Sequence, residues 1–261
     1  MRKWINWVAL VLVFAVACGF LSNWQFNRRE QKLASIQLVQ NNYSSNPVAL
    51  EDLLIGGSFQ LPKDTWRQVK VSGHYLPEKF QLVRNRPNDG QPGFEQLVPF
   101  VTDKGQTIFV SRGWIPTGQT HDYPDEVALP SNEETSIIAR VLASEPKLNR
   151  TAPIGQLASI NLELARVATD LPDAISSGYL RLASEEPMVG KKLVPMPSPS
   201  TEEGNNLSYA IQWILFALMA AGALIWRIKK DAELARGEVR PKKLRRSDLD
   251  AQFEDETTKA K

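Results

Sequence analysis

Residues 209–228 read YAIQWILFALMAAGALIWRI, and this stretch decides how the rest of the chain is organised. It is 20 residues long, and its only charged residue, Arg227, lies near its C-terminal end. A helix rises about 1.5 Å per residue, so the stretch covers roughly 30 Å, the thickness of a bilayer's hydrocarbon core. Trp213 and Trp226 lie near its two ends, where aromatic side chains favour the membrane interface. The stretch therefore predicts a membrane-spanning helix.

One face of this predicted helix is polar and aromatic. Tyr209, Gln212, Trp213 and Phe216 recur at helical spacing and so share that face. Polar groups inside a membrane span raise the free energy unless a partner satisfies them. This face is therefore the first place to look for function.

A second apolar stretch, residues 4–21, follows Met1-Arg2-Lys3. A cleaved signal peptide is one alternative, and a lipoprotein modified at Cys18 is another. The apolar run continues through Phe20 and Leu21, and no clean Ala-x-Ala cleavage site follows it. These features favour a retained membrane helix over both alternatives.

Basic residues predict the orientation of the two spans. Residues 227–246 carry a net charge of +6, whereas the loop of residues 28–208 carries −3. We therefore expect both termini in the cytoplasm and the loop in the periplasm. With no Arg/Ser-rich leader before the first span, a bacterial inner (plasma) membrane is favoured over an organelle. The cluster Arg240–Arg246 is expected to determine topology or to lie on anionic lipid, and no nucleic-acid-binding fold accompanies it.

The loop has the length and patterning of one α+β domain with a mostly antiparallel sheet, barrel-like or sandwich. Period-two patterns predict strands at 66–76, 79–86, 94–101, 107–115, 136–142 and 178–183. Helices are expected from the first span to about Gln40, over 47–54 and over 157–168. The predicted segments are a membrane helix (1–27), a periplasmic domain (28–194), a linker (195–208), a second membrane helix (209–228) and a charged, largely disordered tail (229–261).

The residues offer little for catalysis. The chain has two histidines, and only an unsupported fold would pair Ser111 with His121 as nucleophile and base. No zinc spacing, phosphate-binding loop or dinucleotide fingerprint occurs. The sole cysteine, Cys18, lies in the first span, so the domain is expected to fold without disulfides. We predict a protein that is not an enzyme and has no metal site.

Polar and aromatic residues gather where the two spans meet the outer surface. Trp24, Gln25 and Arg28 close the first span, and Tyr209, Gln212 and Trp213 open the second, with Gln25 and Gln212 expected at nearly equal depth. Small residues at four-residue spacing, Ala15 with Gly19 and Ala217 with Ala221, would let the spans pack on each other or on a partner's helices. The alternative interpretation is an ordinary belt of interfacial aromatic residues with Arg28 capping the exit.

Several motifs together resemble the surfeit locus protein 1 family of cytochrome oxidase assembly factors. In chain order they are Trp24-Gln25-x-x-Arg28-x-x-x-Lys32; Trp66-x-x-Val69-x-x-x-Gly73-x-Tyr75; Arg84; Gly93; Val110-Ser-Arg112-Gly113-Trp114-Ile-Pro116; and Asn205-Asn-Leu-Ser-Tyr209-Ala-Ile-Gln212-Trp213. Each motif is weak alone, but their order and spacing extend from residue 24 to residue 213.

The resemblance implies a chaperone of cytochrome c oxidase that acts when haem a enters the catalytic subunit, with that subunit and haem a synthase as partners. Under this interpretation Arg28 and Arg112 suit haem propionates. The aromatic residues Tyr209, Trp213 and Phe216 suit the porphyrin face. An alternative is that Arg112-Gly113-Trp114 simply ends a strand and fills the core.

One position departs from the family pattern. The family commonly has histidine just before the Leu-Ser-Tyr-Ala run, where this chain has Asn206, a poor ligand for haem iron. Met219 or a domain histidine are the remaining candidates for a ligand. The resemblance thus predicts no certain cofactor, and leaves open a haem-independent membrane scaffold whose periplasmic domain binds another complex.

Overall fold

The computed structural model describes residues 2–237 and divides them into two compact units. The first unit contains the chain up to Glu30 and from Gly204 onward, and the second contains Gln31–Glu203. The first unit is helical, and the second holds the whole sheet.

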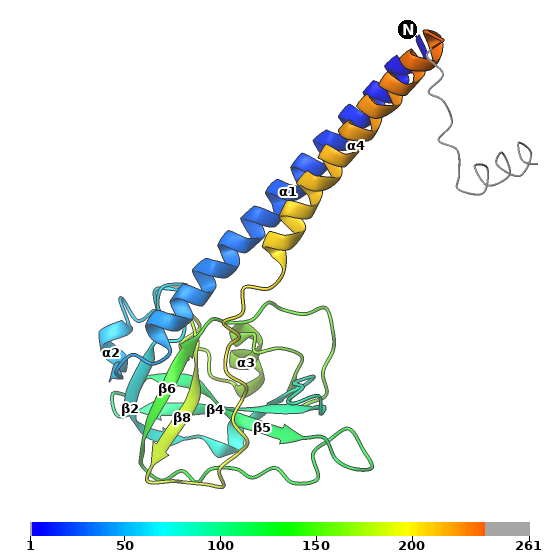
Figure 1. Ribbon diagram of the computed structural model, residues 1–261. Helices are drawn as coiled ribbons and strands as arrows, with labels where there is room; N and C mark the ends of the chain where they lie inside the picture. Colours follow the sequence, from blue (N-terminus) through cyan, green and yellow to red (C-terminus); the bar gives the residue numbers. More distant parts are fainter. Residues whose placement is uncertain (1, 238–261) are drawn as a thin grey trace, which may run out of the picture. The chain divides into compact units, whose positions relative to one another are not determined.

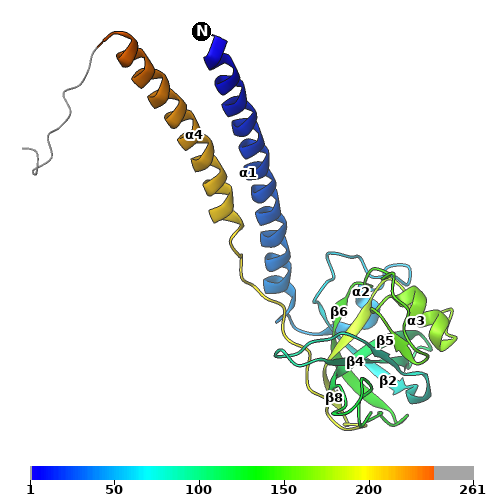
Figure 2. The same ribbon diagram turned by 90° about the vertical axis from the view of Figure 1, so that its right-hand side faces the viewer.

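The first unit consists of two long helices. They are α1 (Arg2–Asn42), which belongs to this unit as far as Glu30, and α4 (Asn206–Ala235). Both are long and apolar enough to cross a membrane, as the sequence predicts. They lie side by side and run antiparallel in Figures 1 and 2. The helix α4 continues to Ala235, so the start of the predicted disordered tail is helical. The basic cluster Arg240–Arg246 lies outside the described residues.

The last part of α1 belongs to the second unit. Ile36 and Val39 are buried there at helical spacing, and the helix ends at Asn42 as its sequence predicts. The Asn42 side-chain amide donates hydrogen bonds to the carbonyl oxygens of Lys63 (2.9 Å) and Thr65 (2.8 Å). These bonds anchor the helix end to the loop that precedes the barrel.

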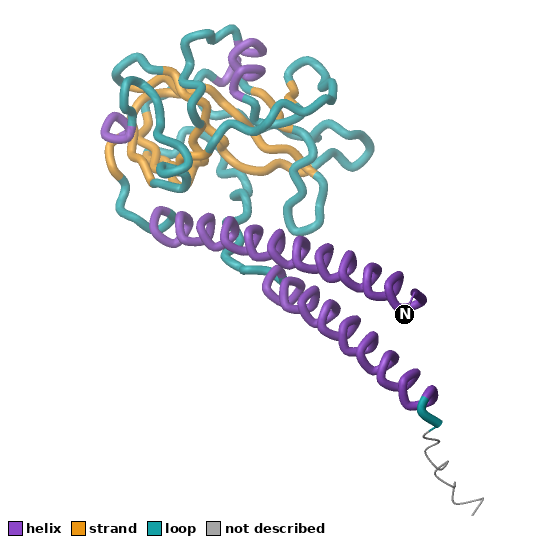
Figure 3. Tube along the Cα trace, turned by 90° about the horizontal axis from the view of Figure 1, so that it is seen from above, coloured by secondary structure: helices purple, strands orange, loops and turns teal. Residues whose placement is uncertain are grey.

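Five strands of the second unit close into a barrel (Figures 1 and 3). They are β2 (Gln68–Tyr75), β6 (Thr135–Leu142), β8 (Tyr179–Glu186), β5 (Thr107–Pro116) and β4 (Gly93–Thr102), in that order around the barrel. All neighbours are antiparallel except β5 and β8, and β4 pairs with β2 to complete the ring. The expected antiparallel α+β domain is confirmed, and of the two alternatives the sheet forms the barrel.

Shorter elements extend the sheet and correct several predictions. They are β1 (Val48–Ala49), α2 (Leu50–Leu53), the 3₁₀ turn η1 (Pro77–Lys79), β3 (Gln81–Val83), β7 (Gln156–Leu157) and α3 (Leu162–Thr169). The helix expected over 47–54 keeps one turn, because Val48 and Ala49 pair with β2. The helix expected over 157–168 begins at Leu162, because Gln156 and Leu157 pair with β3. Asn161 caps that helix by accepting a hydrogen bond from the backbone N–H of Leu164 (3.1 Å).

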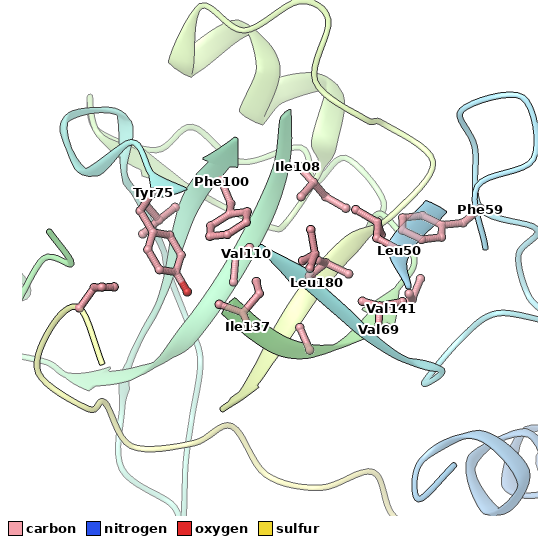
Figure 4. Packing of buried hydrophobic residues seen from close by; sticks show 14 residues of the cluster. Leu50, Phe59, Val69, Tyr75, Phe100, Ile108, Val110, Ile137, Val141 and Leu180 are labelled. Carbon is pink, nitrogen blue, oxygen red and sulfur yellow. The ribbon is translucent and has the colours of Figure 1, made fainter. Parts of the chain in front are cut away.

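The barrel interior is filled by large apolar side chains that come from every strand (Figure 4). Tyr75, Phe100, Ile108, Ile137 and Leu180 are all fully buried there. Burying one such side chain stabilises the fold by about 1.5–3 kcal/mol. A second apolar cluster packs α3 against the outside of the sheet.

Gly73 allows the barrel to close. It pairs with Thr102 where β2 meets β4. A Cβ atom at this position would lie 2.0 Å from the carbonyl oxygen of Val101. Only glycine lets the two backbones approach this closely.

Candidate functional site

The two spanning helices of the first unit pack through small residues. Cys18, Ser22 and Ala210 are buried, at 1%, 5% and 0% exposure. The Ser22 hydroxyl donates a hydrogen bond to the carbonyl oxygen of Ala210 (3.0 Å), which places these two residues at one level. Small side chains let the backbones approach closely enough for this bond to form.

Of the predicted pair Ala15 and Gly19, only Ala15 lies at the contact between α1 and α4. Gly19 lies off the contact, and a Cβ atom placed on it would meet nothing within 4 Å. The contact follows Ala15, Cys18 and Ser22, at alternating spacings of three and four residues. Antiparallel helices that pack along their length need this average repeat of 3.5 residues. Residues repeated strictly every four positions rotate away from the face that contacts the other helix.

Six of the seven predicted site residues lie in this helical unit, and we call them the polar–aromatic cluster. They are Trp24, Gln25, Arg28, Tyr209, Gln212 and Trp213. Counting about 1.5 Å per residue from the Ser22–Ala210 level, Trp24, Gln25 and Tyr209 lie within roughly 5 Å on one side of it. Gln212 lies about 3 Å on the other side. Gln25 and Gln212 are thus offset by about 8 Å along the pair of helices.

Most side chains of the polar–aromatic cluster are open to a partner. Trp24 and Tyr209 are each 50% exposed, and Arg28 and Gln212 are also exposed. Among residues 2–237, no side chain accepts a hydrogen bond from the Arg28 guanidinium or pairs with it. Trp213 instead packs edge-to-face on Phe216, with ring centroids 5.7 Å apart. The cluster therefore presents donors and ring faces that the helices themselves do not use.

The seventh predicted residue, Arg112, lies in the barrel domain and is already engaged there. Its Nη2 atom pairs with Glu185 Oε1 (3.0 Å), and its Nη1 atom donates to Gln96 Oε1 (3.2 Å). The guanidinium also lies over the ring of Tyr75, 5.3 Å from its centroid. The Tyr75 hydroxyl donates to the second oxygen of Glu185 (3.2 Å). A ligand carboxylate at Arg112 would compete with Glu185.

Burial sets the ionisation of this group of side chains. Desolvation raises the pKa of Tyr75 well above its ordinary value, and the nearby negative charge of Glu185 raises it further. The phenol therefore stays protonated and remains a hydrogen-bond donor.

A second buried group surrounds Glu95, which is completely buried. The Ser111 hydroxyl donates to its Oε1 atom. Arg86 Nε lies 3.3 Å from its Oε2 atom, and Arg181 Nη2 lies 3.8 Å from Oε1. Arg86 also pairs with Glu145 (2.5 Å). Burial alone lowers the pKa of Arg86, but the hydrogen bond with Glu145 and the charge of Glu95 outweigh it, so the guanidinium stays charged.

The sequence analysis missed Glu95, Arg86, Glu145 and Arg181, because their partners come from strands far apart in the chain. The structure also separates the one nucleophile–base pair that was considered. Ser111 bonds to Glu95, whereas His121 lies in an exposed loop with Asp125 (3.6 Å) and the carbonyl oxygen of Tyr123 (2.6 Å). Across residues 2–237, no group of three His, Cys, Asp or Glu side chains could hold a metal ion.

Comparison with known proteins gives one consistent result. The SURF1 family model matches residues 12–218. An uncharacterised SURF1-like protein of Mycobacterium tuberculosis is 32% identical over 224 residues, which cover 82% of this chain and 80% of that protein. A SURF1-like protein of Rickettsia bellii is 28% identical, with 88% and 92% covered. The cytochrome oxidase assembly protein SHY1 of Saccharomyces cerevisiae is 25% identical, with 51% and 36% covered.

Proposed function

Because the chain belongs to the SURF1 family, we propose that it serves the assembly of cytochrome oxidase. The observation that carries the proposal is the family match over the barrel domain and the adjoining parts of both spans, together with the name of the yeast relative. The proposed location is a bacterial inner membrane, with both termini in the cytoplasm and the barrel in the periplasm. Charge asymmetry about the two apolar helices supports this orientation.

The step proposed is the entry of haem a into the catalytic subunit, which would be the direct partner, together with haem a synthase. The polar–aromatic cluster supports this step, since Arg28 has no acceptor among the described residues and Tyr209 presents half of its surface. An arginine suits a propionate, and an aromatic ring suits a porphyrin face. These side chains would hold and orient the haem while the spans exclude water.

The helical unit offers few side chains that could ligate the haem iron. Asn206 begins α4 at the family's histidine position, and both histidines of the chain, His74 and His121, lie in the barrel domain. Met219, which is 59% exposed, is the thioether available in the span. This favours a second candidate, a haem-independent scaffold in which the polar–aromatic cluster recognises helices of a partner.

Deleting the gene tests the oxidase role. The reduced-minus-oxidised spectrum of the membranes should lose haem a signal and oxidase activity, and a plasmid copy should restore both. An unchanged spectrum and unchanged activity would refute the assembly function.

Spectroscopy of the purified protein separates the haem step from the scaffold. Protein co-expressed with haem a synthesis should show a Soret band that weakens in Arg28→Ala and Tyr209→Phe. An Arg150→Ala variant is the matched control, since Arg150 is an exposed residue of the barrel domain. Absence of a band in a strain whose deletion phenotype is confirmed would select the scaffold.

A further inference from the structure

A cavity of about 520 Å³ opens on the outside of the barrel, wholly within the second unit. Arg140 of β6 and Arg181 of β8 line it, as do Tyr43 and Trp66. The segment from Val194 to Ser198 forms a further wall. Its volume falls in the range of small-molecule sites, about 300–1,000 Å³.

The two arginines lie side by side on neighbouring strands. Arg140 and Arg181 are register partners in the antiparallel pair of β6 and β8. The Cβ atoms of such partners lie about 4.5–5.5 Å apart, and like charges at these positions are destabilising. An anion bound to both guanidinium groups would offset this repulsion.

The protein supplies little of that anionic charge itself. Arg181 has one carboxylate neighbour, Glu95, at 3.8 Å, which is beyond hydrogen-bond distance, and its buried Nε atom has no acceptor. Arg140 donates through Nε to the carbonyl oxygen of Tyr43 (3.2 Å), and its terminal nitrogens have no acceptor within residues 2–237. Asp89 also lines the cavity but pairs with neither arginine. Guanidinium donors are therefore left open at this site.

Aromatic rings hold both guanidinium groups in place. Arg140 lies 3.9 Å from the ring centroid of Tyr43, and Arg181 lies 5.4 Å from that of Trp66. The two rings pack on each other, with centroids 5.8 Å apart. The planar groups are thus oriented before any ligand arrives, which lowers the entropic penalty of binding.

The backbone of Trp66 is strained at this position. Its φ of 70° lies in the left-handed region, which bulky residues rarely adopt. A hydrogen bond from its N–H to the carbonyl oxygen of Val141 (2.8 Å) holds it there. Such strain costs of order 1–3 kcal/mol and clusters at ligand sites. The indole of this strained residue is the ring that packs on Arg181.

We propose that this cavity binds an organic carboxylate that has an apolar or aromatic body. The carboxylate would accept hydrogen bonds from Arg140 and Arg181, since guanidinium groups match it in a bidentate geometry. The body would rest on the apolar wall that includes Leu182, Val194 and Met196. The Tyr43 hydroxyl and Ser198 Oγ are 3.0 Å apart and join two walls of the cavity.

Calorimetry on the full chain in lipid nanodiscs tests the site, with empty nanodiscs as the blank. The probes are naphthoate, its neutral analogue naphthylmethanol, and acetate, which lacks the ring body. We expect naphthoate to bind at one saturable site per chain. Naphthylmethanol and acetate should each bind at least tenfold more weakly, because each lacks one of the two recognition elements.

Variants then assign the binding to the two arginines. Arg140→Gln and Arg181→Gln should each weaken naphthoate binding tenfold or more, and Arg150→Gln, an exposed change elsewhere on the domain, should leave it unchanged. Arg140 is partly exposed and its hydrogen bond goes to the carbonyl oxygen of Tyr43, so its variant should keep the wild-type circular dichroism spectrum. Absence of saturable naphthoate binding, affinity unaffected by Arg140→Gln, or equal affinity for acetate and naphthoate would each overturn the proposal.

Discussion

At the scale of single residues, the buried carboxylate of Glu95 contacts Arg86, Arg181 and Ser111 and so contributes to the stability of the barrel domain. Removing one partner from a buried ion pair leaves the other buried and unpaired, which costs about 3–5 kcal/mol. We expect Glu95→Gln to lower the free energy of unfolding by less than that full amount, about 1–3 kcal/mol, because Arg181 loses its carboxylate neighbour whereas Arg86 keeps its pair with Glu145.

Denaturant unfolding of the domain, followed by near-ultraviolet circular dichroism, measures this loss. Glu163→Gln is the matched control, because Glu163 is exposed and pairs with Arg166 at the surface (3.6 Å). That change should stay below about 0.5 kcal/mol. Similar losses in both variants would contradict the role given to Glu95.

The buried tyrosines predict how stability depends on pH. Burial is the main cause that raises the pKa of Tyr75 and of Tyr179 in the folded state. The folded protein therefore keeps these protons when the unfolded chain, with a tyrosine pKa of about 10, releases them. Stability should be unaffected by these groups below about pH 10 and should fall above it, by up to about 1.4 kcal/mol per pH unit for each tyrosine.

The Tyr75→Phe variant isolates one of these two contributions. Its free energy of unfolding should fall less steeply than that of the wild type between about pH 10 and pH 11, although the variant is less stable at neutral pH because Glu185 loses a donor. Lysine titration affects both proteins alike and leaves the difference in slope intact. Parallel slopes would show that the Tyr75 pKa is not raised.

At the scale of elements, the pairing of α1 with α4 depends on the size of Ala210. A leucine there has no space, because Ala210 is fully buried against α1, and overpacking typically costs about 1–3 kcal/mol. Gly19→Leu should be tolerated, since Gly19 has open space around its Cβ position. Unfolding in mixed micelles of increasing dodecyl sulfate, followed by tryptophan fluorescence, should show an earlier transition for Ala210→Leu alone. Equal shifts of the transition in both variants would mean that α1 and α4 do not pack through Ala210.

Elements with their own periodicity were predictable from the sequence, and those that depend on distant partners were not. The strands β2 and β6 alternate buried and open residues, so their patterns identify them. The two-residue strands β1 and β7 carry no pattern and form because β2 and β3 present open edges to them. Both spans were predictable from length and apolarity, but Gly19 was grouped with Ala15 because four-residue spacing ignores the 3.5-residue repeat of packed helices.

The same distinction explains what was found of the candidate sites. The placement of the polar–aromatic cluster in one helical unit was predictable because its residues lie at the ends of two apolar runs, and its role stays a prediction. The cavity at Arg140 and Arg181 was not, because it depends on the register of β6 against β8 and on a strained turn at Trp66. Arg112 was found through the family motif, but its partner Glu185 comes from another strand and could not be read from the sequence.

At the scale of the whole molecule, the oxidase proposal requires a definite orientation in the membrane. The polar–aromatic cluster lies where α1 leaves the apolar stretch and α4 enters it, at the ends of the two spans that connect to the barrel domain in the chain. We expect alkaline phosphatase fused after Ala235 to be inactive and the same enzyme inserted at Ser131, in a loop of the domain, to be active, because this reporter folds only after export. A fluorescent protein that folds only in the cytoplasm should give the reverse pattern at the same two positions. The physical reason is the excess of lysine and arginine after the second span, since cations within about 15–20 residues of a span are retained in the cytoplasm.

Arg28, Arg29 and Lys32 oppose that rule next to the first span, so replacing all three with glutamine should leave the orientation unchanged while removing a cation from the cluster. Activity of the phosphatase after Ala235 would place the cluster at the cytoplasmic surface and would contradict the periplasmic location proposed for the barrel.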